Sequence, residues 1–164
     1  MKNISVKIIT LSDRAYQGKY EDKSGSLIEE MLTAFFKENG IEAKMDKNLI
    51  PDEAEMLTES VLNAVGQNTD LIFTTGGTGI SPRDITPDVI KPLLDKEIPG
   101  IMEFIRVKYG MKFPNAILSR GIAGVANNTI IYTLPGSVKA VKEYLDEIIP
   151  TLLHSLKMLQ GEGH

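Results

Sequence analysis

Cysteine is absent from the 164-residue chain, and its absence excludes several classes of protein. The chain has no disulfide scaffold, no thiol nucleophile and no cysteine-ligated zinc or iron–sulfur site. Long hydrophobic runs are absent too, since runs such as Leu71-Ile72-Phe73 are too short to cross a bilayer. The first residues lead into a strand-like pattern without the apolar core of a signal peptide. We therefore expect a soluble, cytoplasmic protein with no membrane partner.

Positive charge is also scarce. The 18 lysines and arginines are outnumbered by 22 acidic residues, the formal net charge is −4 and the isoelectric point is about 5.3. No basic arm or cluster is present in the sequence, which argues against nucleic acid as a partner. A small anionic ligand stays compatible, because a local pocket can be positive on an acidic protein. Arg14, Arg83 and Arg120 lie beside stretches containing Gly, Ser or Asp, which suits such a ligand.

The composition that remains is typical of a globular domain. Hydrophobic residues make up 42% of the chain and charged residues 24%, close to the average for globular proteins. The length suits one domain of ordinary size, and no linker, repeat or low-complexity segment interrupts it. We expect residues 1–164 to form a single domain.

Strand-like and helix-like patterns alternate along the chain. Runs rich in β-branched residues predict buried strands at 4–11, 43–49, 70–75 and 129–134. Apolar residues at helical spacing predict helices beginning near residues 26, 52, 86, 99 and 137. The helix that begins at 99 carries Ile101, Phe104 and Ile105. Alternation with short connections predicts an α/β fold whose parallel sheet is covered on both faces.

Capping signals mark several helix boundaries. Ser26 and Glu29 fit a capping box, and Thr86 with Pro87 fits the N-cap and first helical position. Ser137 can cap the last helix, which Pro150 is expected to kink or divide.

A glycine-rich loop follows the predicted strand at 70–75. In parallel α/β sheets the ligand lies at the carboxyl ends of the strands, which selects residues 12–14, 50–52, 74–84 and 134–137. Gly76, Gly77 and Gly79 allow positive φ angles and close approach of backbone N–H groups to phosphate oxygens. Hydroxyl and guanidinium donors follow in the same stretch: Thr75, Thr78, Ser81 and Arg83.

This loop matches neither of two common phosphate-binding motifs. It lacks the Gly-Lys-Ser/Thr of a P-loop, and its glycines do not fit the dinucleotide fingerprint. A glycine cluster alone also fits a tight turn between a strand and a helix. The following Arg83-Asp84 and Thr86-Pro87-Asp88 make the stretch more specific.

Two carboxylates, Asp52 and Asp84, follow neighbouring strands. Beside a phosphate loop they would suit Mg²⁺, which takes few protein oxygens together with substrate phosphates. Each also has a purely structural interpretation, because Asp52 can cap its helix and Asp84 can form an Asx turn. Asp13 is a third candidate, whereas Asp88 fits the first turn of a helix.

The remaining candidates carry weaker signals. His154 lies among leucines and fits a satisfied helix-face histidine better than a ligand. No G-x-S-x-G elbow is present, which argues against a Ser-His-Asp hydrolase. Tyr16 and Tyr20 can stack on a flat ring or lie exposed, and Ser119-Arg120 suggests an anion contact.

Six motifs occur in an order that resembles the Mog/MoaB family of molybdenum-cofactor biosynthesis, which includes the gephyrin G domain. They are Leu11-Ser-Asp-Arg14, Ile50-Pro-Asp52, Thr74-Thr-Gly-Gly-Thr-Gly79, Arg83-Asp-Ile-Thr-Pro87, Ile117-Leu-Ser-Arg120 and Leu134-Pro-Gly-Ser137. The resemblance covers essentially the whole chain. One departure is Val138, where the family commonly has proline.

The resemblance implies a fold and an activity. The fold would be a three-layer α/β/α sandwich with a mostly parallel sheet, and the assembly a homotrimer. The activity would be adenylyl transfer from Mg-ATP to the terminal phosphate of molybdopterin, with release of pyrophosphate. A MoeA-like molybdenum insertase would then receive the product.

The resemblance also assigns site residues by position. Asp52 and Asp84 match the two functionally required aspartates and would hold Mg²⁺. We expect Asp52 to help hold Mg-nucleotide and Asp84 to orient the pterin or the metal. Substrate and phosphate contacts are expected at Ser12, Asp13, Thr75, Gly76, Gly77, Thr78, Gly79, Ser81, Arg83, Ser119, Pro135, Gly136 and Ser137.

Three alternatives stay open at this point. The first is a MoaB-like protein that binds molybdopterin without efficient transfer, against which Asp52 and Asp84 argue. The second is a flavodoxin-like nucleotide- or flavin-binding domain, and the third is a scaffolding trimer. The sequence does not decide between molybdenum and tungsten, or whether the nucleotide is strictly ATP.

Overall fold

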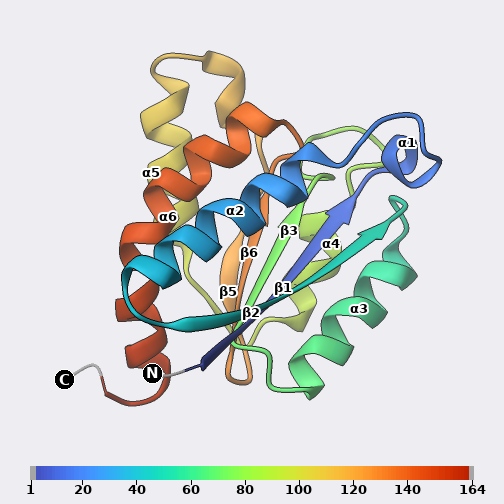
Figure 1. Cartoon of the computed structure of the whole chain (residues 1–164). Coiled ribbons are helices and arrows are strands. Elements are labelled where there is room, and N and C mark those ends of the chain that lie inside the picture. The colour runs from blue at the N-terminus through green and yellow to red at the C-terminus, as the bar shows by residue number, and fades with distance from the viewer. Residues whose placement is uncertain (1–2, 163–164) are drawn as a thin grey trace.

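One mixed sheet forms the centre of the protein. The computed structural model describes residues 3–162, and within them the sheet has the strand order β2-β1-β3-β6-β5-β4 (Figure 1). The strands are β1 (Asn3–Leu11), β2 (Glu42–Ile50), β3 (Leu71–Thr75), β4 (Lys96–Glu97), β5 (Ala123–Ala126) and β6 (Thr129–Leu134). β2, β1, β3 and β6 pair in parallel, whereas β5 pairs antiparallel with β4 and β6. The prediction of a mostly parallel sheet is confirmed.

Helices cover both faces of the sheet. The helical segments are α1 (Asp13–Tyr16), α2 (Lys23–Glu38), α3 (Ala54–Gly66), α4 (Thr86–Ile90), η1 (Lys91–Leu93), α5 (Pro99–Gly110), η2 (Pro114–Leu118) and α6 (Val138–Leu159). One hydrophobic core joins α2, α5 and α6 to the sheet, and a second joins α3 and α4 to its other face (Figure 1). The expected three-layer α/β/α architecture is therefore confirmed.

The strand sequences explain why both faces need a cover. In β1, Ile4, Val6 and Ile8 enter the core beneath α2 and α6, whereas Ile9 and Leu11 enter the core beneath α3. Successive side chains of a strand point to opposite faces, so a strand that is apolar at nearly every position must be buried on both. All six residues of β6 are buried for this reason.

Two capping predictions are wrong. α2 begins at Lys23, three residues before Ser26, and its N-cap is Asp22, whose Oδ1 accepts a hydrogen bond from the Gly25 N–H at 2.9 Å. Thr86 is the first residue of α4 rather than its N-cap, because its hydroxyl instead donates to the Gly76 carbonyl at 2.8 Å. Ser137 caps α6 as expected, accepting a hydrogen bond from the Ala140 N–H.

α5 and α6 carry the apolar residues expected of them. In α5 the buried residues are Met102 and Ile105, whereas Phe104 is 55% exposed. α6 runs unbroken from Val138 to Leu159, so the prediction that Pro150 divides it is wrong, and a kink at Pro150 stays a prediction. Among the described residues, no helix combines the length and apolarity that a membrane span requires.

Candidate active site

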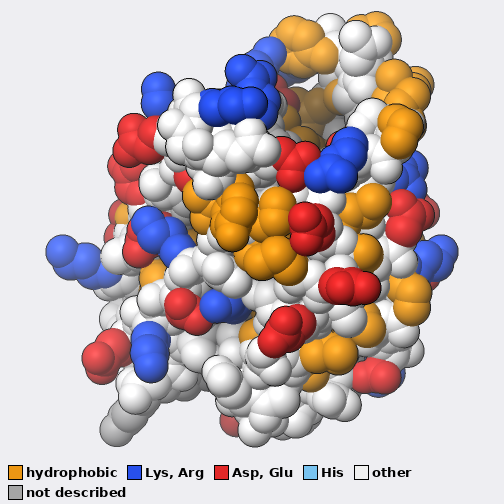
Figure 2. All heavy atoms as spheres, turned by 90° about the vertical axis from the view of Figure 1, so that its right-hand side faces the viewer, with side chains coloured by type: hydrophobic (Ala, Val, Ile, Leu, Met, Phe, Trp, Pro, Cys, Tyr) orange, Lys and Arg blue, Asp and Glu red, His pale blue; other side chains and the backbone are white. Residues whose placement is uncertain are grey.

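A cavity of about 680 Å³ opens at the carboxyl edge of the parallel strands. Its walls come from the segments that follow β1, β2, β3 and β6, so the predicted convergence of four strand ends is found. β1 lies between β2 and β3, so Asp52 and Asp84 do not follow neighbouring strands as expected. α5, η2 and the start of α6 close the other side. The face in Figure 2 is hollowed near its top, where hydrophobic side chains gather at the rim. Of the predicted site residues, those that line the cavity are Ser12, Asp13, Asp52, Gly76, Gly77, Thr78, Gly79, Asp84, Ser119, Pro135, Gly136 and Ser137.

Three predicted residues lie outside this lining. Thr75 is buried and its hydroxyl donates to the Pro135 carbonyl at 2.7 Å, which joins the ends of β3 and β6. Ser81 and Arg83 lie on the exposed part of the loop after β3, and both make polar contacts with aspartates that line the cavity.

The glycine loop has positive φ angles at Gly76 and Gly77 but not at Gly79. Gly76 has a φ of +100° and Gly77 a φ of +68°, angles that side-chain-bearing residues rarely adopt. A Cβ at Gly76 would lie 2.3 Å from the Leu11 carbonyl oxygen, and a Cβ at Gly77 would lie 2.5 Å from the Thr86 hydroxyl. Glycine is therefore required at both positions by the backbone and by the lack of space.

Asp84 braces the same loop from within. Its Oδ2 accepts a hydrogen bond from the Ser81 N–H at 2.8 Å, which holds residues 81–84 in a tight turn. This hydrogen bond is the turn contact that the structural interpretation of Asp84 predicts. Asp84 nevertheless also lines the cavity. Gly79 allows the close fit, because a Cβ there would lie 2.7 Å from Asp84 Oδ2.

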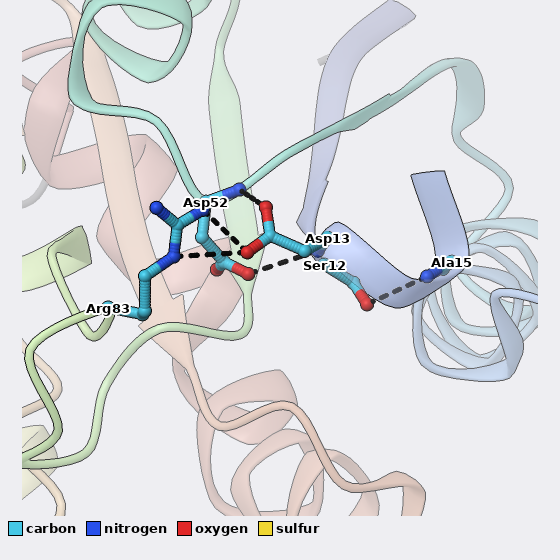
Figure 3. A network of polar contacts seen from close by, with 5 residues as sticks. All are labelled: Ser12, Asp13, Ala15, Asp52 and Arg83. Atoms are coloured by element: carbon cyan, nitrogen blue, oxygen red, sulfur yellow. Dashed lines mark hydrogen bonds and ion pairs between the residues drawn. The ribbon is translucent and has the colours of Figure 1, made fainter. Parts of the chain in front are cut away.

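Asp13 and Asp52 clasp each other across the ends of β1 and β2 (Figure 3). The Asp13 N–H donates to Asp52 Oδ2 at 3.0 Å, and the Asp52 N–H donates to Asp13 Oδ1 at 2.9 Å. Asp52 is not a helix cap, since α3 begins after Glu53. The Nε and Nη2 atoms of Arg83 donate to Asp13 Oδ2 at 3.0 and 2.5 Å.

The clasp gives the two carboxyl groups different acidities. The hydrogen bond from the Asp52 N–H, together with Arg83, lowers the pKa of Asp13 below that of an ordinary aspartate. Burial raises the pKa of Asp52, and the negative charges of Asp13 and Asp84 add to that direction. Asp13 is therefore the more firmly ionised member of the pair.

Arg120, in the segment before β5, also holds the glycine loop. Its guanidinium donates to the Gly79 carbonyl at 2.7 Å and to the Asp84 carbonyl at 2.5 Å. Its Nη1 atom donates to both carboxylate oxygens of Asp88, each at 2.9 Å. These contacts engage the Arg120 guanidinium within the protein, and the anion contact suggested at Ser119-Arg120-Gly121 stays a prediction. Asp88, in the first turn of α4, lies where it was expected.

The far wall of the cavity contains residues that the sequence did not single out. The Tyr144 hydroxyl contacts Ser119 Oγ at 3.1 Å, and Arg106 donates to the Gly121 carbonyl at 2.8 Å. The other unpredicted polar residues of this wall are Tyr109, Asn115 and Glu143. The spacing of Ala140 and Tyr144 after Ser137 would have placed both on one face of α6.

The aromatic and histidine candidates separate in the structure. Tyr20 lines the cavity, and its hydroxyl lies 2.7 Å from Ser12 Oγ. Tyr16 lines a different groove, beside β2 and α3. His154 is exposed on α6 and does not line the cavity. Val138 takes the first helical position of α6, as expected.

Comparison with known proteins identifies the family. Residues 7–154 match the family model described as a probable molybdopterin binding domain. The molybdopterin adenylyltransferase of Helicobacter pylori strain J99 is 35% identical over 162 residues, covering 98% of this chain and 90% of that protein. Gephyrin of Dictyostelium discoideum is 38% identical over 163 residues, which are 96% of this chain and 23% of gephyrin.

A solved structure agrees with these relatives. The molybdopterin biosynthesis enzyme MoaB from Thermus thermophilus superposes with a TM-score of 0.84 at 39% identity. The match covers 96% of this chain and 97% of that enzyme. The chain therefore belongs to the Mog/MoaB family of molybdenum-cofactor biosynthesis.

Proposed function

We propose that this protein is a molybdopterin adenylyltransferase, which transfers AMP from ATP to the terminal phosphate of molybdopterin. The observation that carries the proposal is the cavity wall on which the glycine loop, Asp52 and Asp84 meet. Relatives at about 35% identity over nearly the full chain bear this name. The proposal treats residues 1–164 as one molybdopterin-binding domain.

The reaction needs positioning and charge neutralisation more than it needs a strong base. A phosphate oxygen of molybdopterin attacks the α-phosphorus of ATP, and the bond from that phosphorus to the oxygen bridging it to the β-phosphorus breaks. Pyrophosphate leaves with the electron pair of that bond. The nucleophile is already an anion, so no side chain has to remove a proton from it.

The glycine loop supplies the surface for phosphate in this proposal. The Gly76 N–H donates to the Leu134 carbonyl at 3.0 Å, so the backbone donors for phosphate would be the N–H groups that follow it, where the positive φ of Gly77 turns the chain. The hydroxyl of Thr78, which also lines the cavity, can add a donor. Backbone donors fixed in this way stabilise charge without reorganising during the reaction.

The carboxylates of the wall fit a requirement for Mg²⁺. The cavity lining carries more acidic side chains, Asp13, Asp52, Asp84 and Glu143, than basic ones, Arg14 and Arg106. A lining with this charge would repel ATP and molybdopterin unless a cation accompanied them. Mg²⁺ is commonly bound by one or two carboxylates plus substrate phosphates. Among residues 3–162 no cluster of three or more metal-ligating side chains is found.

In this proposal Asp52 and Asp84 hold the cation. When bound, Mg²⁺ would neutralise the phosphates of ATP and draw charge from the leaving pyrophosphate. Asp52 then orients the nucleotide, and Asp84 orients the molybdopterin or the metal. α5 and α6 form the opposite wall of the cavity in which the phosphates would react.

We further propose a homotrimer that delivers its product to a MoeA-like insertase. Large apolar side chains are exposed on α5 and the segment after it, and subunit contacts commonly cover surfaces of this kind. They are Phe104, Val107, Met111, Phe113, Ile117 and Leu118. Light scattering on the purified protein should give three times the mass of one chain, and a monomeric mass would remove the trimer from the proposal.

The activity test uses the wild-type protein with freshly prepared molybdopterin and Mg-ATP. We expect adenylylated molybdopterin and pyrophosphate in equal amounts, and neither when molybdopterin is omitted. Tight binding of molybdopterin without any product would instead support a binding protein that lacks efficient transfer. ATP hydrolysis to AMP without adenylylated product would also contradict the proposal.

A further inference from the structure

One carboxylate, Asp13, joins three of the segments that build the cavity (Figure 3). It follows β1, its Oδ1 accepts the Asp52 N–H from the segment after β2, and its Oδ2 accepts the guanidinium of Arg83 from the loop after β3. The Ser12 N–H, one residue earlier, donates to the Ile50 carbonyl at 3.0 Å. Asp13 therefore lies just beyond the backbone hydrogen bonds that pair β1 with β2, where side-chain contacts join the two segments instead.

The first of these contacts fixes Asp52. A reciprocal pair of hydrogen bonds, each from the backbone of one aspartate to the carboxylate of the other, restrains both the main chain and the side chain of Asp52. Ser12 completes the support, because its Oγ accepts the Ala15 N–H and thereby caps α1. The Asp52 carboxylate is thus presented at a fixed place on the wall.

The second contact fixes the loop that carries Asp84. Residues 80–83 are exposed, and Arg83 is 60% exposed, so hydrophobic packing does little to place this stretch. Polar ties act instead: Arg83 reaches Asp13, and Arg120 holds the carbonyls of Gly79 and Asp84. The contact between this loop and the segment after β1 therefore depends on Asp13.

We propose that Asp13 is a positioning residue, which sets the distance between Asp52 and Asp84 by holding the first through its backbone and the second through Arg83. This inference rests on the proposed function, because only in that function are Asp52 and Asp84 important for catalysis. Misplacement of reacting groups by about 1 Å can cost about 100-fold in rate. A residue that sets this geometry therefore affects turnover without touching substrate.

A direct contact with phosphate suits Asp13 less well than positioning. Both of its carboxylate oxygens already accept hydrogen bonds within the protein, one from the Asp52 N–H and the other from the Arg83 guanidinium. An anionic side chain facing a polyphosphate would repel it. The same charge is required to hold Arg83, since a carboxylate pairs with a guanidinium more strongly than a neutral amide does.

The test compares Asp13→Ala, Asp13→Asn and an exposed control, Asp46→Asn on β2. We expect Asp13→Ala to lower kcat about 10- to 100-fold while the KM for each substrate changes less than about threefold. The kcat of Asp13→Asn should lie between those of wild type and Asp13→Ala. The amide oxygen can still accept a hydrogen bond from the Asp52 N–H, but the neutral side chain no longer forms an ion pair with Arg83. Asp46→Asn should match wild type.

A double-mutant cycle with Arg83→Met shows whether Asp13 acts through Arg83. If it does, Asp13→Asn should cost much less kcat in the Arg83→Met background than in wild type, because the contact is already lost. Equal losses in both backgrounds would mean that Asp13 does not act through Arg83. A rise in the KM for ATP or molybdopterin with kcat unchanged would also overturn the proposal.

Amide hydrogen exchange gives a readout that does not depend on turnover. In Asp13→Ala, exchange should speed up in peptides covering residues 51–53 and 79–85, while peptides from α6 stay unchanged. Unchanged exchange in both regions overturns the positioning role. If wild type proves inactive, the proposed function fails, and exchange alone decides whether Asp13 holds these segments. If wild type is active and the Asp13 variants match it, only this inference fails.

Discussion

Gly79 shows how closely single residues of this site are fitted. Its φ is not in the left-handed region, so alanine can adopt its backbone conformation. The obstacle is Asp84, whose Oδ2 would lie 2.7 Å from the added Cβ. The methyl group would therefore displace the carboxylate rather than strain the main chain.

Gly79→Ala should consequently damage activity more than stability. We expect kcat for AMP transfer to fall at least about 10-fold, with the free energy of unfolding changed by no more than about 1 kcal/mol. Gly100→Ala on α5 is the control, since a Cβ there has no neighbour within 4 Å. Urea unfolding and steady-state kinetics measure both quantities, and a Gly79→Ala enzyme with wild-type kcat would contradict the proposed role of Asp84.

Tyr132 is a second residue whose surroundings give a prediction. Its ring stacks on Phe73 with centroids 5.0 Å apart, and burial raises its pKa to about 12. Thr151 and Ser155 lie near its hydroxyl and offset part of that rise, but none of the described residues forms a hydrogen bond with it. Tyr132→Phe should therefore change stability by less than about 1 kcal/mol at neutral pH.

At alkaline pH the same tyrosine makes folding depend on pH. An unfolded tyrosine releases its proton near pH 10, whereas folded Tyr132 keeps its proton up to about pH 12. Between these values the unfolded state binds fewer protons, so stability falls as pH rises, by at most about 1.4 kcal/mol per pH unit from this group. Urea unfolding at pH 8.5 and pH 11 should show a smaller fall for Tyr132→Phe than for wild type. Equal falls would mean that Tyr132 does not keep its proton in the folded protein.

At the scale of elements, Arg120 joins the glycine loop to α4 and to the segment before β5. Its two contacts with carbonyls need the planar guanidinium fork, which lysine cannot reproduce. Arg120→Lys should lower stability by about 1–3 kcal/mol and reduce kcat, because the loop carries Asp84. Asp88→Asn separates the two kinds of contact, since it removes an exposed ion pair worth less than about 1 kcal/mol. If Asp88→Asn proves as costly as Arg120→Lys, the carbonyl contacts are not what holds the loop.

Strands were predicted from the sequence better than helix starts. The strand predicted at 129–134 has those bounds in the structure, and the one predicted at 4–11 begins one residue earlier. α2 begins before its expected cap because Asp22 accepts two hydrogen bonds, from Gly25 within the helix and from Thr10 in β1. The contact with Thr10 joins two different elements, so the local sequence around Asp22 does not predict it.

β5 was missed for a different physical reason. Its sequence, Ala123-Gly-Val-Ala126, lacks the β-branched run that identifies a strand. A Cβ at Gly124 would lie 2.5 Å from the Lys96 carbonyl oxygen, so glycine here allows two strands to approach. Glycine usually disfavours a strand, but at position 124 it allows β4 and β5 to pair closely, which only the folded structure shows.

At the scale of the whole molecule, the parallel sheet explains which half of the site could be predicted. Strand ends share one edge by topology, so residues that follow β1, β2, β3 and β6 were bound to meet. The other half comes from packing of α5 and α6, which brings Arg106 and Tyr144 to the cavity. No sequence rule relates those helices to the glycine loop.

The contact between Asp13 and Arg83 could not be predicted from the sequence either. They are 70 positions apart, and each was expected to meet substrate rather than the other. Only the geometry of the folded strand ends pairs them.

The central claim, that this wall of the cavity carries out adenylyl transfer, is tested most directly at Asp84. Wild type, Asp84→Asn and the exposed control Asp46→Asn are mixed with molybdopterin and Mg-ATP, and adenylylated molybdopterin is followed with time. Asparagine can still accept the Ser81 N–H, so folding should stay intact. The account predicts turnover lowered about 100-fold or more in Asp84→Asn and unchanged in Asp46→Asn. Near-wild-type turnover in Asp84→Asn would contradict it.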